Sequence, residues 1–139
     1  MADDAPNPSP RFRRLFTLDE ANGLIRQLSP LLVTLRADRE AALRIQRSLK
    51  ALTPAMRGNG SGPRVAELER DLRRLALKIA AGVRQVTALG VEIKDLDHGV
   101  IDFPARRDGR FVYLCWHLGE DRIAFWHDLD SGYAGRQPL

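Results

Sequence analysis

Residues 111–139, FVYLCWHLGEDRIAFWHDLDSGYAGRQPL, hold both Trp, both Tyr, the only Cys and two of the three His of a 139-residue chain. Apolar and polar side chains alternate along much of this stretch, a period of two that is typical of β-strands with one buried face. The Asp108-Gly109 pair just before it favours a tight hairpin turn. The same period begins after Gly90, so the sequence predicts a four-stranded antiparallel meander with strands at 91–96, 100–105, 110–118 and 122–128.

The turns fix which residues of the predicted sheet lie opposite each other. A two-residue turn at Asp108-Gly109 places Phe103 opposite Leu114, and a four-residue turn at 119–122 then places Leu114 opposite His127. The face expected to pack on the helices carries His127 together with Ile101, Phe103, Val112, Leu114, Trp116, Leu118, Ile123 and Phe125. The other face is expected to carry Asp102, Tyr113, Cys115, His117, Trp126 and Asp128.

The first half of the chain predicts two long helices. Thr17 and Glu20 have the spacing of a capping box at the start of the first helix. Pro30 predicts a kink or a break near residues 28–30, because proline lacks a backbone N–H and clashes with the preceding turn. Apolar residues recur at alternating intervals of three and four, which is the pattern of a coiled-coil seam. The seams are Leu24, Leu28, Leu31, Leu35, Asp38, Ala42, Ile45, Leu49 and Leu52 in the first helix, and Val65, Leu68, Leu72, Leu75, Ile79, Gly82, Val86 and Leu89 in the second.

Residues 53–63, TPAMRGNGSGP, separate the two seams and predict a loop, and Gly90 follows the second seam where a left-handed cap belongs. A phosphate-binding loop has little support, because no strand precedes the glycines and no Gly-Lys-Ser or Gly-Lys-Thr ends them. The predicted fold class is α+β: a long antiparallel helical hairpin, with its first helix kinked near Pro30, followed by a four-stranded antiparallel β-meander. The predicted organisation is a flexible tail at 1–14 and a single domain at 15–139, made of the hairpin (15–90), the sheet (91–128) and a C-terminal segment (129–139) that docks on the sheet.

The composition limits the classes of function. The formal net charge is +4 and the pI is about 9.8, but acidic and basic residues alternate along both predicted helices, which argues against a nucleic-acid partner. One Cys cannot form an internal disulfide, which fits a reducing cytoplasm. No apolar run reaches the roughly 18–20 residues that span a bilayer, and residues 1–14 lack the apolar core of a signal peptide. We therefore expect a cytoplasmic protein without a membrane partner.

His127 is the leading candidate for a functional side chain, and three interpretations are open. It is a buried structural His with one hydrogen-bond partner, or a binding-site His that works with Asp128, Asp130 and Arg136, or a ligand of a divalent metal together with carboxylates such as Asp95 and Asp128. Arg136 can clamp a carboxylate or phosphate through two hydrogen bonds, so a small anionic ligand is also expected as an alternative.

The remaining Cys and His residues are weaker candidates. Cys115 and His117 point the same way from one predicted strand, and such a pair can bind a metal or supply a nucleophile. A half-buried Cys beside a solvent-facing His is the simpler interpretation. His98 falls in a predicted turn and is most simply a turn residue.

Three stretches resemble a known family: FTLDEANGLIRQLSPLL at 16–32, GVEIKDLDHGVIDFPARRDGRFVYLCWHLGE at 90–120, and IAFWHDLDSGYAGRQPL at 123–139. Together they are similar to domain-of-unknown-function family 2203, small uncharacterised bacterial proteins, over about residues 15–139. His98, Cys115 and His117 fall outside the family pattern, which puts a catalytic role for them in doubt. The resemblance implies no activity. The positions that match are Asp95, Asp102, Phe103, Pro104, Gly109, Trp116, Gly119, Glu120, Trp126, His127, Gly132, Gly135, Arg136 and Pro138.

The length of the two seams leads to the first functional expectation. A small sheet cannot cover helices of this length, so part of each seam is expected to face another copy of the chain. The first hypothesis is therefore a self-associating, non-enzymatic binding or assembly module, most simply a dimer. The alternatives are a metal- or small-anion-binding protein or an enzyme with a site around His127 and Arg136, and a weak nucleic-acid binder that rests on the pI alone.

Overall fold

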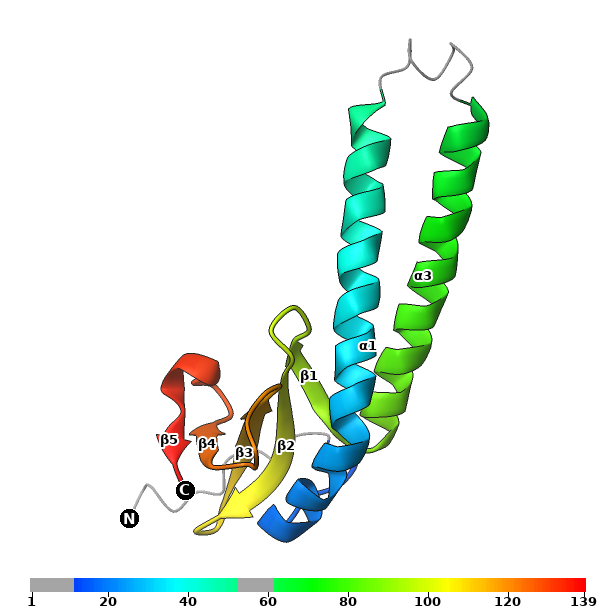
Figure 1. Ribbon diagram of the computed structural model, residues 1–139. Helices are drawn as coiled ribbons and strands as arrows, with labels where there is room; N and C mark the ends of the chain where they lie inside the picture. Colours follow the sequence, from blue (N-terminus) through cyan, green and yellow to red (C-terminus); the bar gives the residue numbers. More distant parts are fainter. Residues whose placement is uncertain (1–11, 53–61) are drawn as a thin grey trace.

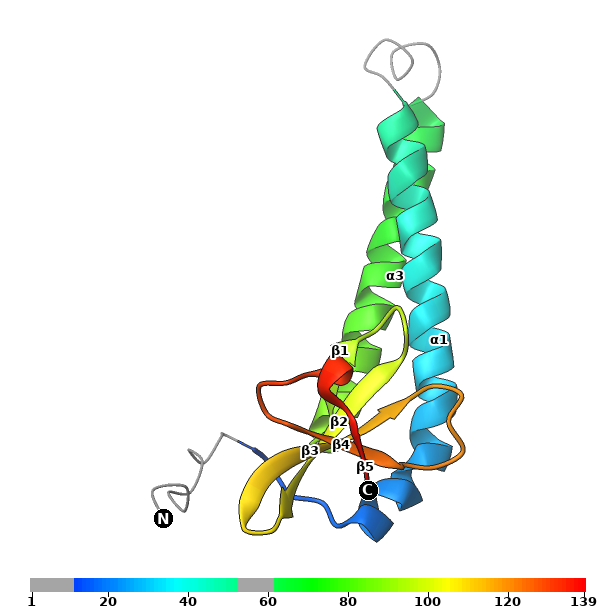
Figure 2. The same cartoon turned by 90° about the vertical axis from the view of Figure 1, so that its left-hand side faces the viewer.

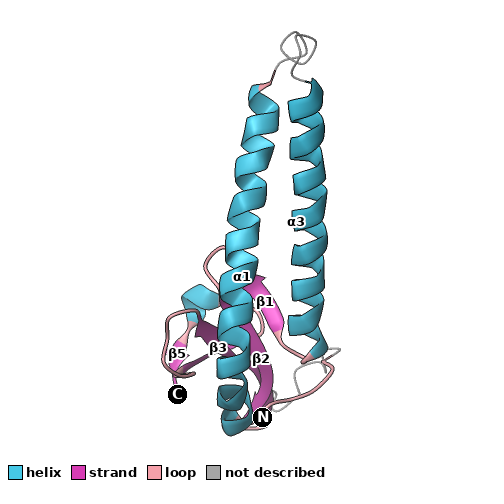
Figure 3. Ribbon diagram, turned by 45° about the vertical axis from the view of Figure 1, so that its right-hand side comes forward, coloured by secondary structure: helices cyan, strands magenta, loops and turns pink. Residues whose placement is uncertain are grey.

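A computed structural model describes residues 12–52 and 62–139, and it contains two long helices followed by a small antiparallel sheet (Figure 1). The helices lie side by side as a hairpin, and the sheet covers only the end of the hairpin where the first helix begins and the second ends (Figure 3). The elements are α1 (Leu18–Ala51), α3 (Gly62–Ala88), β1 (Glu92–Asp95), β2 (Val100–Arg107), β3 (Arg110–His117), β4 (Phe125–Asp128), the short 3-10 helix η2 (Tyr133–Gly135) and β5 (Gln137–Pro138).

The sheet has five strands in the order β1-β2-β3-β4-β5, and all neighbours are antiparallel. The predicted α+β class, a helical hairpin followed by an antiparallel sheet, is confirmed, but the predicted number of four strands is wrong. The C-terminal segment adds β5 at the edge of the sheet, where Phe125 pairs with Pro138 and Trp126 with Gln137. A strand of two residues is too short to show the alternation by which strands are recognised in a sequence.

Two predicted segments lie mostly outside the described residues. Of the predicted glycine-rich loop at 53–63 only residues 62 and 63 are described, and of the predicted tail at 1–14 only residues 12–14. Phe12 packs edge-on against the sheet, with its ring centroid 6.1 Å from that of Phe111 and 5.7 Å from that of Tyr113. The last residues before the domain are therefore held by aromatic contacts.

The capping box predicted for α1 is confirmed. Thr17 Oγ1 accepts a hydrogen bond from Glu20 N at 3.1 Å, and the Glu20 carboxylate accepts one from Thr17 N at 2.9 Å. The helix has 34 residues, a length of about 50 Å at roughly 1.5 Å per residue. It continues through Pro30 without a break, and the kink at Pro30 stays a prediction.

The two seams meet along the hairpin. Gly82 allows a close approach of the two helices, because a Cβ added there would lie 2.5 Å from Cδ2 of Leu35. The core lies where the hairpin meets one face of the sheet, and burial of each large apolar side chain there contributes about 1.5–3 kcal/mol. The sheet supplies Ile101, Phe103, Ala105, Val112, Leu114 and Trp116, and the helices supply Ala21, Leu28, Leu32, Leu35 and Val86.

The predicted register is right for one strand pair and wrong for the next. Phe103 lies opposite Leu114 as expected, and the hairpin turn has positive φ at both Asp108 (52°) and Gly109 (79°). Between β3 and β4, however, Tyr113 lies opposite His127 and Leu114 opposite Trp126, which is one residue away from the predicted pairing. Trp126 therefore packs against the core, while His127 lies on the opposite face of the sheet.

The connection from β3 to β4 explains this difference. It spans residues 118–124 and is not a four-residue turn. Glu120 holds it by accepting a hydrogen bond from His117 N at 2.8 Å with its side chain and one from Trp116 Nε1 at 3.0 Å with its backbone oxygen. Ile123 reaches the core from this connection, since its N–H donates to Asn22 Oδ1 at 2.8 Å. The apolar residue thus stays buried without belonging to a strand.

Candidate functional site

The face of the sheet turned away from α1 and α3, called here the outer face, carries a group of polar side chains from neighbouring strands. Glu92 and Asp102 lie opposite each other on β1 and β2, and Asp102 lies opposite Cys115 on β3. Tyr113 and His127 are a further pair on β3 and β4. The segment that follows β4, which includes η2, lies in front of this face (Figure 2). The register of three strand pairs therefore builds the group.

A cavity of about 730 Å³ opens over this group and is called here the outer cavity. All three His residues of the chain line it. Carboxylates from the β1–β2 hairpin, from β2 and from the segment after β4 surround them. The full lining is Lys94, Asp95, His98, Val100, Asp102, His117, His127, Leu129, Asp130, Gly132 and Tyr133.

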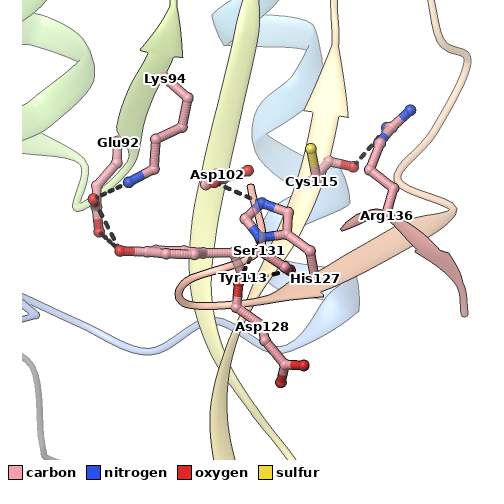
Figure 4. Close-up of polar contacts among 9 residues, drawn as sticks. All are labelled: Glu92, Lys94, Asp102, Tyr113, Cys115, His127, Asp128, Ser131 and Arg136. Carbon is pink, nitrogen blue, oxygen red and sulfur yellow. Dashed lines mark hydrogen bonds and ion pairs between the residues drawn. The ribbon is translucent and has the colours of Figure 1, made fainter. Parts of the chain in front are cut away.

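Asp102 and His127 form a buried pair at the wall of the outer cavity (Figure 4). His127 Nε2 lies 2.8 Å from Asp102 Oδ2, and the two residues are 1% and 0% exposed. His127 Nδ1 lies 2.7 Å from the backbone oxygen of Asp128, which can only accept a hydrogen bond. Nδ1 therefore carries a proton, and a second proton must lie between Nε2 and the carboxylate oxygen, because 2.8 Å is a hydrogen-bond distance and is too short for two ligands of one metal ion.

The environment of the pair shifts two pKa values. Burial on its own lowers the pKa of His127, but the hydrogen bonds to Asp102 and to the Asp128 backbone, with the charge of Asp102, outweigh it and raise the pKa. Burial first, and the Asp102 charge second, raise the pKa of the Cys115 thiol to about 12. In the ligand-free site the pair thus holds its proton and the sulfur is a neutral thiol.

One oxygen of this site is left over. Among the described residues Asp102 Oδ1 is buried and no donor lies in hydrogen-bonding geometry to it, although the Asp102 carboxylate is near enough to the Cys115 thiol to raise the thiol pKa. Ligand atoms of Asp102, Cys115 and His127 all lie within 4.8 Å of one another, the one group of described residues in which three or more His, Cys, Asp or Glu side chains meet in this way. A buried carboxylate oxygen without a protein donor is rare in native proteins, and this oxygen is able to accept a hydrogen bond or to coordinate a cation.

A second hydrogen-bonded group flanks the pair. Tyr113 Oη donates to the Glu92 carboxylate, at 3.0 and 2.9 Å from its two oxygens, and Lys94 Nζ donates to the same carboxylate at 2.9 Å. Burial and then the Glu92 carboxylate raise the pKa of Tyr113 to about 12. The Tyr113 ring lies 5.4 Å from the His127 ring, centroid to centroid. Tyr113 is therefore a neutral donor that holds one side of the site.

The other two His residues share the orientation of His127. His98 Nδ1 lies 2.8 Å from Asp95 Oδ2, and His117 Nδ1 lies 3.0 Å from the backbone oxygen of Leu118. In each of the three rings Nδ1 faces an oxygen acceptor, while Nε2 of His127 faces Asp102 Oδ2 at 2.8 Å and Nε2 of His117 lies 3.7 Å from Glu120 Oε2. A lone pair on one nitrogen with the other fixed by an acceptor is the usual arrangement of a metal-binding His.

Arg136 has a different setting from the one that the sequence predicts. Its Nη2 lies 2.6 Å from Glu120 Oε1 and 3.2 Å from the backbone oxygen of Cys115. Its guanidinium lies over the rings of Phe125, at 4.2 Å, and Tyr133, at 4.6 Å. The side chain connects the C-terminal segment to the β3–β4 connection and does not line the outer cavity.

The structure brings some of the predicted site residues together and separates others. His127, Asp95 and Asp130 line the outer cavity. The Asp128 side chain lies beside Arg110, with 3.6 Å between Oδ1 and Nη2, and contributes to the site only through its backbone oxygen. Asp102 is the functional candidate that the sequence reasoning leaves out. Its place on the outer face is predicted correctly, but the one-residue error in the β3–β4 register puts His127 on the other face.

The fold and this group of residues define an α+β protein with a long helical hairpin and a buried Asp–His pair on the outer face of its sheet. The chain belongs to the family described as "Uncharacterized conserved protein (DUF2203)", whose model matches residues 14–139. This confirms the resemblance seen in the sequence. No curated protein and no solved structure matches the chain. Neither of the two long helices, over their described residues, combines the length and the apolar character needed to cross a lipid bilayer.

Proposed function

We propose that the protein binds a small cationic ligand in the outer cavity, at Asp102. The observation that carries this proposal is the Asp102 carboxylate, which is fully buried and has one oxygen without a partner among the described residues. Such an oxygen costs about 1–3 kcal/mol or more when it is charged. A cation or a charged hydrogen-bond donor that enters from the cavity removes this cost.

The charges around the cavity favour a cation over an anion. Three carboxylates, those of Asp95, Asp102 and Asp130, line the cavity. Two cationic groups oppose them: the Lys94 ammonium, which already donates to Glu92, and the protonated His127 ring, which pairs with Asp102. The anionic alternative depends on Arg136, whose Nη2 donates to Glu120 and to a backbone oxygen, while its buried Nε has no partner among the described residues. Arg136 does not line the outer cavity, so an anion in the cavity would meet like charge without a guanidinium beside it.

Titration followed by NMR tests the proposal. The amide signals of the cavity residues are followed with 1,4-diaminobutane, guanidinium and Zn²⁺ as cations, and with acetate and phosphate as anions at equal ionic strength. We expect the cations to shift these signals, and Asp102→Asn to weaken binding at least about tenfold, because it removes the buried charge. Asp130→Asn, a change at an exposed carboxylate of the same cavity, is the control and should have a smaller effect. Larger shifts with the anions, or unchanged binding by Asp102→Asn, contradict the proposal.

Self-association through the helical hairpin is a second candidate function. The hairpin extends well beyond the sheet (Figure 1), and seam residues in its far half, such as Ile45, Val65 and Leu72, are only half-buried. A second copy packed along this part would bury them. Sedimentation at micromolar concentration should then show a dimer, and the Tm should rise with protein concentration. A monomer with a Tm independent of concentration contradicts this candidate.

Nucleic-acid binding has less support. Some cations of the hairpin lie beside carboxylates: Arg39 pairs with Asp97, Lys78 with Asp38 and Arg64 with Glu67. A nucleic-acid surface needs cations that are free to neutralise phosphates, and its affinity falls steeply with salt. Any DNA or RNA affinity of this protein is therefore expected to be weak and non-specific.

A further inference from the structure

We propose that the cationic ligand is a transition-metal ion of the zinc class, bound by Asp102, Cys115 and His127. This inference rests on the proposed function and narrows it to one kind of cation and three named donors. Cys115 lies outside the family pattern described above, so the inference concerns this chain and not the family as a whole. It differs from the metal set expected from the sequence, because the observed register replaces Asp95 and Asp128 by Asp102 and Cys115.

The ligand atoms of the three residues lie close enough together to bind one metal ion after small side-chain movements. They come from three adjacent strands, with Asp102 directly opposite Cys115 and His127 on the next strand. Their ligand atoms lie within 4.8 Å of one another. Zinc bonds of about 2.0–2.3 Å hold tetrahedral donors about 3.3–3.8 Å apart. Side-chain rotations that move His127 Nε2 and Asp102 Oδ2 apart by about half an ångström, and shorten the longest spacing among the donors by up to roughly an ångström, therefore complete the site.

The surroundings of His127 are those of a metal ligand. Its Nδ1 is fixed by the backbone oxygen of Asp128 at 2.7 Å, which directs Nε2 at the Asp102 carboxylate. Nε2 and Oδ2 are both lone-pair atoms once the proton between them is removed, and a divalent cation takes the place of that proton. Asp102 Oδ1, which has no partner among the described residues, is the other oxygen through which Asp102 can bind the ion. A backbone carbonyl that accepts from the other ring nitrogen, as Asp128 does here, is a usual support of a zinc-binding His.

The combination of nitrogen, sulfur and oxygen donors favours one class of metal ion over another. One imidazole nitrogen, one sulfur and one carboxylate suit Zn²⁺ and Co²⁺, whereas Mg²⁺ and Ca²⁺ prefer oxygen donors alone. Binding replaces the thiol proton of Cys115 and the proton shared by His127 and Asp102. Each ion that binds therefore releases two protons to solvent, with no change in oxidation state.

The position of the outer cavity leaves one side of the ion open. Asp102 and His127 line the cavity, while Cys115 is fully buried behind them. Three protein donors with a fourth position that faces a cavity are typical of zinc sites that exchange a water or a small ligand, and closed sites with four protein donors are typical of structural zinc. We therefore expect an exchangeable water in the fourth position.

Titration of the metal-free protein with Co²⁺ tests this inference. The expected result is one equivalent of Co²⁺ with a thiolate-to-cobalt charge-transfer band in the near ultraviolet, visible bands of four-coordinate cobalt, and displacement by Zn²⁺ but not by Mg²⁺. Cys115→Ala should abolish the charge-transfer band, and His127→Gln should weaken binding by at least about 10–100-fold, the range known for changes around metal ligands. His98→Gln is the matched control, since His98 lines the same cavity outside the three donors, and it should keep the full spectrum.

The outcomes separate this inference from the proposed function. A wild-type spectrum without the charge-transfer band, or equal Co²⁺ affinity in wild type, Cys115→Ala and His127→Gln, overturns the metal centre. If 1,4-diaminobutane or guanidinium still binds in a way that depends on Asp102, the proposed function stands without the metal. If neither these cations nor Co²⁺ binds, both fail. The wild-type spectrum alone decides the metal question even where a variant does not fold.

Discussion

At the residue scale, the Asp102–His127 hydrogen bond couples the stability of the metal-free protein to pH. The folded state raises the pKa of His127 above its unfolded value, so the pair contributes its full stability below about pH 6.5 and loses it as the pH rises through the raised pKa. In the presence of a chelator, the free energy of unfolding should fall in this range by up to about 1.4 kcal/mol per pH unit. Denaturant unfolding at a series of pH values measures this slope.

Asp102→Asn is predicted to reverse the sign of that slope. The change keeps the size of the side chain and its hydrogen bond to His127, but it removes the charge that raises the His127 pKa. Burial then dominates and lowers the pKa, so stability should rise with pH as His127 loses its proton. His98→Gln leaves the buried pair intact and should keep the wild-type slope. A slope in Asp102→Asn equal to that of the wild type shows that the pair is not the titrating unit.

At the element scale, α1 and α3 make a close contact at Gly82 on α3. A Cβ there would meet Leu35 Cδ2 at 2.5 Å and Cγ at 3.0 Å, and Leu35 is itself buried. We predict that Gly82→Ala destabilises the protein by about 1–3 kcal/mol through overpacking. Gly23→Ala on α1 is the control: no atom lies within 4 Å of its added Cβ, and the better helix propensity of Ala should add up to about 1 kcal/mol. Chemical denaturation of both variants measures the difference, and equal effects at the two positions would show that the helices are not this close.

The edge strand β5 depends on Arg136. Its ion pair with Glu120 at 2.6 Å and its hydrogen bond to the Cys115 backbone hold the C-terminal segment against the sheet. In Arg136→Lys, the ammonium group lacks the planar guanidinium. It therefore cannot hold the same pair of hydrogen bonds and stack on the two aromatic rings. We predict faster hydrogen exchange at the Leu139 amide, which donates to Ala124 O at 3.0 Å, with little change at amides of the β2–β3 pair. Unchanged exchange at Leu139 contradicts this account of β5.

Local chemistry decides which of these elements are predictable from the sequence. The start of α1 follows from Thr17 and Glu20, and the β2–β3 register follows from Asp108-Gly109, because each signal lies within a few residues and has one geometry. The β3–β4 register is not predictable in this way, because the connection at 118–124 is held by Glu120 and by a contact from Ile123 to Asn22, about a hundred residues away in the chain. His127 was a candidate from its residue type, but its partner Asp102 depends on that register.

At the scale of the whole molecule, the helices and the Asp102–His127 pair, which lines the outer cavity, lie on opposite sides of the sheet (Figure 4). The sheet positions the donors, and the hairpin buries the other face of the same strands. Gly82 on α3 and Asp102 on the outer face of the sheet do not contact each other. We therefore predict that Gly82→Ala and Asp102→Asn act additively on the free energy of unfolding, within about 0.5 kcal/mol. A double-mutant cycle measures the coupling, and a value above about 1 kcal/mol would show that the hairpin transmits strain to the site.

At the centre of the proposal, His127 Nε2 and the Asp102 carboxylate share a proton, which a Zn²⁺ ion can replace. The most direct test is the ¹⁵N NMR spectrum of the His127 imidazole as Zn²⁺ is added to the chelator-treated protein. The account predicts protons on both ring nitrogens in the metal-free protein near pH 6, followed by loss of the Nε2 proton and retention of the Nδ1 proton when Zn²⁺ binds. A neutral His127 ring in the metal-free protein, with signals that stay unchanged at saturating Zn²⁺, would contradict it.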